Sequence, residues 1–181
     1  MRRATVVVVA LLCVTGLASA ERDRSEKPGA VPPAPRILAF DAMYGVDGPF
    51  VGPANPIRGI VGDEQPWVVA DHVRGRLDAR GHLKIQVRGL VFADEPSVPP
   101  ELRGKNDEEA FRGAVSCLTE SGPEVSTANV FTQGFPASTT GDSDIDASVV
   151  LPNPCVAPIV FVLAGSEDKW FAVTGFESPE E

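Results

Sequence analysis

Residues Trp67 to Phe92 read WVVADHVRGRLDARGHLKIQVRGLVF and predict one long β-hairpin, around which the rest of the chain is organised. In the second arm the odd-numbered positions from Leu83 to Val91 are apolar or glycine, and the even-numbered positions from His82 to Arg88 are polar. A period of two is typical of a strand with one face in a core and the other in water.

The turn must bring the apolar faces of the two arms together. A three-residue turn at 79–81 pairs Leu77 with Leu83, whereas a two-residue turn would pair Leu77 with His82 and mix the faces. Three-residue hairpin loops usually contain a residue in the left-handed conformation, and glycine adopts it at least cost. Gly81 stands at that position, so we predict the register that opposes Leu77 and Leu83.

The same register gathers basic side chains on the outer face of the hairpin, although the chain has a formal net charge of -9. We interpret this face as a candidate binding site for an anionic polymer or a protein partner. The alternative is a solvated face whose cations pair with acids on a neighbouring strand. The candidate binding residues are Arg74, Arg76, Lys84 and Arg88.

The first 20 residues, MRRATVVVVALLCVTGLASA, have the design of a secretory signal peptide: two arginines, a short apolar run and an A-x-A cleavage site. The apolar run is too short for a permanent membrane anchor, so we expect an exported protein, secreted, periplasmic or on the cell surface, with no transmembrane anchor after cleavage. Residues 21–36 are charged and rich in proline and predict a disordered tether. Residues 37–176 then form a single domain, and 177–181 an acidic tail.

Eight or nine short strands with frequent turn signals predict an all-β domain, an antiparallel β-sandwich, with a closed β-barrel as the alternative. Ile37 to Tyr44 is the expected first strand, and Pro158 to Leu163 (PIVFVL) is apolar throughout, as in a strand buried on both faces. Asn106 to Phe111 is the one candidate for a helical turn after the signal peptide.

Cleavage of the signal peptide leaves two of the three cysteines, Cys117 and Cys155. In an exported protein such a pair predicts one disulfide, which would add about 3–4 kcal/mol in the chain-entropy model. The alternative is two buried free thiols.

No catalytic signature is present. The two histidines, His72 and His82, fall on the outer face of the hairpin, and there is no G-x-S-x-G or other nucleophile motif. Neither zinc nor another cofactor is predicted, and the negative net charge argues against nucleic acid as a partner. Asp142, Asp144 and Asp146 form a weak calcium candidate, but they also fit the outer face of an amphipathic strand.

Part of the hairpin resembles a known family. Gly75-Arg76-Leu77, the turn, and LKIQVRGL at 83–90 are similar to the hairpin of CHRD-type secreted domains, which end such a strand in V-x-G-L. The A-H-I-H-G stretch that follows in that family is absent here, and the resemblance implies no site residue.

The favoured function is therefore a non-catalytic binding domain, secreted or associated with the cell envelope. One alternative is a structural part of a surface assembly. The other is a secreted hydrolase that uses carboxylates of the long loop at 93–110. Its acids are Asp94, Glu95, Glu101, Asp107, Glu108 and Glu109.

Overall fold

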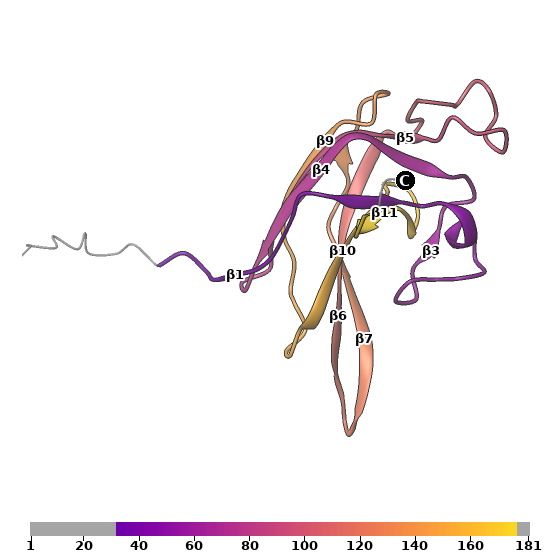
Figure 1. Ribbon diagram of the computed structural model, residues 1–181. Helices are drawn as coiled ribbons and strands as arrows, with labels where there is room; N and C mark the ends of the chain where they lie inside the picture. The colour runs from indigo at the N-terminus through magenta and orange to yellow at the C-terminus, as the bar shows by residue number, and fades with distance from the viewer. Residues whose placement is uncertain (1–31, 177–181) are drawn as a thin grey trace, which may run out of the picture. The chain divides into compact units, whose positions relative to one another are not determined.

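The computed structural model describes residues 32–176, and this part of the chain is almost entirely β-structure (Figure 1). The predicted signal peptide, most of the predicted tether and the tail at 177–181 lie outside the described residues. Within residues 32–176 the helical structure is one 3₁₀ turn, η1 (Gly48–Phe50). The strands are β1 (Arg36–Phe40), β2 (Met43–Gly45), β3 (Val61–Gly62), β4 (Trp67–Asp78), β5 (His82–Phe92), β6 (Ala110–Ser121), β7 (Glu124–Phe131), β8 (Phe135–Pro136), β9 (Ser143–Ser148), β10 (Val156–Ala164) and β11 (Lys169–Thr174).

Two sheets form a sandwich, which confirms the predicted fold class. The first sheet has the order β1-β4-β5-β9, and the second has the order β2-β11-β10-β6-β7. All pairings are antiparallel except the short one between β3 and β11, and β8 adds to β6 outside the main path. The strand count exceeds the expected eight or nine because β2, β3 and β8 have two or three residues each.

The predicted hairpin is β4 and β5, and its register is confirmed from His72 to the turn. Between Val69 and His72 the pairing shifts by one residue, so Val69 lies across from Leu90. Leu77 pairs with Leu83 and Val73 pairs with Val87, so the apolar faces of both arms meet. Gly81 closes the turn at φ 82°, in the left-handed region, and a Cβ added there would lie 1.9 Å from the carbonyl oxygen of Val149. The turn therefore requires glycine for both its backbone conformation and its packing.

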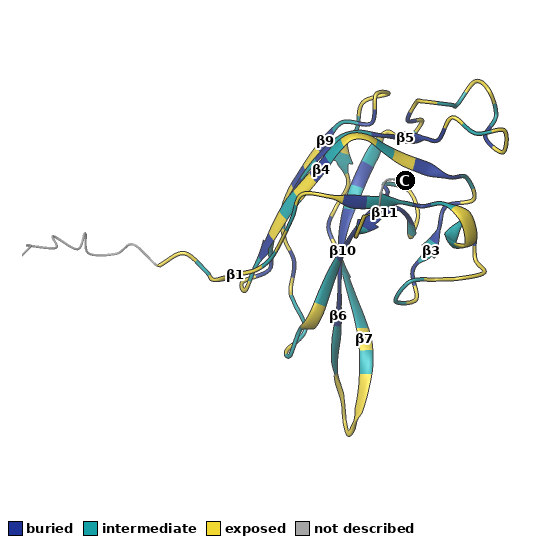
Figure 2. Cartoon of the chain, viewed as in Figure 1, coloured by how far each residue is buried: buried dark blue, intermediate teal, exposed yellow. Residues whose placement is uncertain are grey.

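The main core lies between the two sheets. The inward side chains of β4 and β5 are buried (Figure 2), and Leu77, Leu83 and Ile85 are at most 1% exposed. Trp67 stacks on Phe171 of the second sheet with ring centroids 3.9 Å apart. These contacts fix the face that β4 and β5 turn outward, which carries the predicted binding residues.

The part of the second sheet formed by β11 and the end of β10 is buried on both faces. Its outer face is covered by the segment at 46–62, where Phe50 lies against Trp170 with ring centroids 6.3 Å apart. Trp170 also contacts Phe161 of β10, and Val160 to Leu163 are fully buried. The apolar run PIVFVL is thus a strand covered on both sides, as predicted.

Two local expectations were wrong. The expected first strand divides at Asp41 into β1, which pairs with β4, and β2, which pairs with β11, so the chain passes there from one sheet to the other. Asn106 caps no helix: it is buried, and its side-chain amide donates to the carbonyl oxygens of Glu108 and Ser138, both at 2.8 Å. The Asn106 side chain instead fastens the long loop to the loop before β9.

Cys117 and Cys155 form a disulfide, as predicted. It joins β6 to the residue just before β10 and spans a sequence separation of 38. Residues 32–176 also contain no helix long and apolar enough to cross a membrane. The disulfide is compatible with an exported protein.

Candidate functional site

The outer face of the first sheet carries the predicted basic cluster. Arg76 lies across from Lys84 and Arg74 across from Gln86, as the register required. The edge strand β1 packs alongside and pairs Ala39 with Arg76. Together these strands line a groove of about 490 Å³, called here the arginine groove. Its lining residues are Arg36, Ala39, Phe40, Asp41, Arg74, Gly75, Arg76, Lys84, Gln86 and Asp144.

The side of this face next to β9 is neutralised by aspartates. Lys84 forms an ion pair with Asp146 at 3.0 Å, and Arg88 forms one with Asp144 at 3.1 Å. His82 also contacts Asp146, at 2.6 Å, and the hydrogen bonds from His82 and Lys84 lower the pKa of that carboxyl below its usual range. Two of the four predicted binding residues are thus paired with the neighbouring strand.

The basic residues on the side of this face next to β1 are not neutralised by ion pairs within the described chain. Arg74 donates through Nε to the side-chain oxygen of Gln86 at 2.7 Å, which orients its guanidinium group without neutralising it. Among residues 32–176, no carboxylate forms an ion pair with Arg36, Arg74 or Arg76, and all three side chains are exposed. Sequence reasoning missed Arg36 because it placed this residue in the tether. Only the pairing of β1 with β4 brings Arg36 to the groove.

The calcium candidates do not converge. Asp142 accepts a hydrogen bond from the backbone N–H of Gly89 at 3.0 Å, while Asp144 and Asp146 pair with the cations of β5. In the described part of the chain, the acids close enough to share a metal ion are Asp63, Glu64 and Glu167.

The side chain of Lys169 already pairs with this acidic cluster. The Lys169 ammonium group lies 2.6 Å from a carboxylate oxygen of Glu64 and 2.9 Å from one of Glu167. Hydrogen bonds to Glu64 and then Glu167 raise the pKa of Lys169 above its usual range. Asp63 is buried and accepts from the indole N–H of Trp67 at 2.9 Å, so this cluster is explained by its own contacts.

The acids of the long loop are spread out. Asp107, Glu108 and Glu109 line a pocket of about 380 Å³ together with Ser166, and burial raises the pKa of the Glu108 carboxyl. Glu101 is exposed and does not line that pocket. The arrangement therefore does not unite Glu101 with Asp107 as an acid and base pair there.

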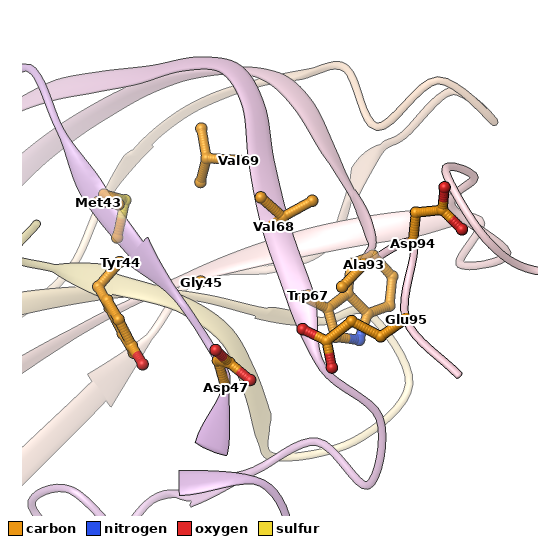
Figure 3. Close-up of a pocket in the computed structure, with 10 residues that line it drawn as sticks. All are labelled: Met43, Tyr44, Gly45, Asp47, Trp67, Val68, Val69, Ala93, Asp94 and Glu95. Carbon is orange, nitrogen blue, oxygen red and sulfur yellow. The ribbon is translucent and has the colours of Figure 1, made fainter. Parts of the chain in front are cut away.

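A further pocket of about 430 Å³ lies between β2 and the start of β4 (Figure 3). Met43, Val68 and Val69 supply apolar walls, and the carboxylates of Asp47 and Glu95 stand near its rim. The Trp67 indole also borders this pocket, but both Phe92 and Phe171 pack against it, at centroid distances of 4.1 and 3.9 Å. Because Trp67 is 2% exposed, its ring is no stacking platform for a ligand.

The two histidines have acidic neighbours and no nucleophile. His72 contacts Asp71 at 3.0 Å, and His82 contacts Asp146. Neither ring is hydrogen-bonded to a hydroxyl or a thiol in the part of the chain that the structure describes. A histidine and an aspartate without a third partner lack the arrangement of a catalytic triad.

No protein-family model matches the chain, and no curated protein or solved structure is significantly similar to it. The resemblance to CHRD-type domains therefore stays confined to the hairpin pattern, and the arginine groove is the feature of the structure that suggests a function.

Proposed function

We propose that this protein is an exported, non-catalytic binding domain that recognises an anionic polymer through the arginine groove. The main support for the proposal is that some basic residues on the outer face of the first sheet are paired with acids and others are not. Lys84 and Arg88 are paired with the aspartates of β9, whereas Arg36, Arg74 and Arg76 have no ionic partner among the described residues. Asp41 and Asp144 also line the groove, but its four basic residues outnumber these two acids and leave a local positive field in a chain with a net charge of -9.

The chemistry of arginine sets the ligand class. A guanidinium group binds carboxylate, phosphate or sulfate through two parallel hydrogen bonds, which makes it the preferred side chain for such groups. Arg74 and Arg76 lie two residues apart on one face of β4, which places their Cα atoms about 7 Å apart. A polymer that repeats its charged groups at a similar spacing would engage both side chains. Phe40 and Ala39 offer an apolar surface beside them for the uncharged parts of the chain.

The predicted signal peptide and the disulfide support export. A disulfide persists in oxidising compartments, where extracellular and envelope polymers bearing carboxylate, phosphate or sulfate groups would be available as ligands.

The test is binding of the purified protein to a sulfated polysaccharide and to poly-glutamate, measured by titration at low and high salt. The double variant R74Q/R76Q should weaken binding at least about tenfold, since each charge-assisted contact contributes about 1.5–3 kcal/mol when fully formed. Wild-type affinity should fall as salt rises, because exposed charges are screened.

The matched control is R103Q/K105Q, which removes the same charge from the long loop, away from the groove. Equal losses in both double variants would show that net charge alone drives binding. Unchanged binding by a folded R74Q/R76Q variant would refute the proposed site.

A further inference from the structure

The outermost strand of the second sheet, β7, has one unoccupied side. β7 pairs with β6 from Ser121 and Glu124 at the turn to Ala114 and Phe131 at the far end, without a register shift. The turn at Gly122 and Pro123 stands clear of the other strands (Figure 1). No other strand of the described chain pairs with β7.

The phase of the pairing identifies the backbone groups on the open side. The backbone N–H of Thr132 donates to the carbonyl oxygen of Gly113 at 2.9 Å, so residues 130, 128 and 126 also exchange hydrogen bonds with β6. The odd-numbered residues therefore point their N–H and C=O groups away from β6. These residues are Val125, Thr127, Asn129 and Phe131, and no described residue bonds to their outward backbone groups.

β7 also lacks the usual protection of an edge strand. Edge strands of natural proteins usually carry charged residues, proline or a bulge, or are very short, because the unpaired backbone groups of an open edge can pair with another strand. The other edges of this domain use these devices: β9 carries Asp144 and Asp146, β1 has a register shift after Arg36, and β2 has three residues. From Val125 to Phe131, β7 has no charged residue, no proline and no bulge.

We propose that β7 pairs antiparallel with β7 of a second copy of this chain, about a two-fold axis at Ala128. Outward residues must meet outward residues, and this register engages all four of them. Val125 then faces the partner's Phe131, and Thr127 faces the partner's Asn129. Each of the four pairs exchanges two backbone hydrogen bonds, about eight in all.

The side chains make this strand self-complementary. Val125 is 73% exposed and Phe131 is 38% exposed, and the register buries each against the other. Branched and aromatic residues across a strand pair stabilise a sheet. The Asn129 amide already donates to the carbonyl oxygen of Arg58 at 3.0 Å, so we assign no side-chain hydrogen bond to the pair of Thr127 and Asn129. No charge lies opposite a like charge. The strand offers no charge that would attract a charged partner segment, and its outward positions are complementary to themselves, so a second copy of the chain is the occupant that fits best.

One strand pair buries little area compared with a stable dimer interface, so the association should be weak, with a dissociation constant in the micromolar range or above. Sedimentation velocity of the full chain, from about 1 to 500 μM, should therefore show a dimer that grows with concentration.

The decisive variant is Thr127→Pro. Because the N–H of Thr127 points away from β6, proline fits the folded monomer there but removes an intermolecular bond from each copy. We expect at least about tenfold weaker dimerisation. The matched control, Thr127→Val, keeps the N–H and the side-chain size and should dimerise like the wild type.

A charge pair tests the register. V125K and F131D should each weaken the dimer, and the double variant should recover it, because the introduced ammonium group faces the partner's introduced carboxylate. Melting curves confirm that each variant is folded. If Thr127→Pro does not fold, the variants V125K and F131D and their combination still test the proposed dimer. A monomer across the whole concentration range, or no recovery in the double variant, would overturn the proposal.

Discussion

Removal of the disulfide should lower the free energy of unfolding by about 4 kcal/mol. The bond between Cys117 and Cys155 closes a loop with a sequence separation of 38, and the chain-entropy model assigns such a loop about 13 cal/mol/K in the unfolded state, or about 3.9 kcal/mol at 25 °C. Since domains of this size are stable by only about 5–15 kcal/mol, this is a large share of the total.

The assay is urea unfolding of the wild type and of C117A/C155A, followed by tryptophan fluorescence. The variant should unfold at lower urea with a steeper dependence on denaturant, because its unfolded chain exposes more surface. The reduced wild type is the control: it keeps both sulfur atoms, so it separates loss of the cross-link from loss of packing around the fully buried Cys117.

A loss of less than about 1 kcal/mol in both the variant and the reduced protein would refute the entropic reasoning, as would an unchanged denaturant slope. A loss confined to the alanine variant would assign the effect to packing.

Three further predictions concern single positions. Gly81→Ala should destabilise the domain by more than the roughly 1–2 kcal/mol that a residue other than glycine costs in the left-handed conformation. The excess is expected because the new Cβ would also clash with the carbonyl oxygen of Val149, and thermal melting measures the loss. Asp63→Asn should stabilise the protein at neutral pH and lose that advantage in acid. Burial raises the pKa of the Asp63 carboxyl, so its ionised form costs stability above the folded pKa and is relieved as pH falls through it; urea titrations at several pH values test this. Asp146→Asn should strengthen binding of the polyanion by releasing Lys84 toward the groove, and weaker binding would count against the arginine groove.

The hairpin between His72 and the turn could be predicted because its information is local, whereas the register shift between Val69 and His72 was not expected. The alternation of β5 and the single glycine at 81 leave one register that keeps the apolar faces together, and the structure adopts it. The buried strand β10 and the disulfide followed from equally local signals, an unbroken apolar run and a pair of cysteines.

The misses depend on contacts between segments far apart in the sequence. The passage from β1 to β2 has no turn residue such as glycine or proline to indicate it, and the two strands differ in the sheet that each joins. The pairing of β5 with β9 decides which cations are neutralised, and nothing near Lys84 indicates that Asp146 lies beside it. Asn106 had the composition of a helix cap, but its buried amide found carbonyl partners across the loop instead.

The arginine groove and the open edge of β7 belong to different sheets. Pairing through β7 would leave both grooves of a dimer uncovered, so one assembly would present two equivalent sites. A long polymer held by one groove is at high effective concentration for the second, and overall affinity can then exceed that of a single site by about 10²–10⁴-fold. Short oligomers of the same chemistry would gain nothing from the second groove, so the domain would distinguish its ligands by length as well as by charge.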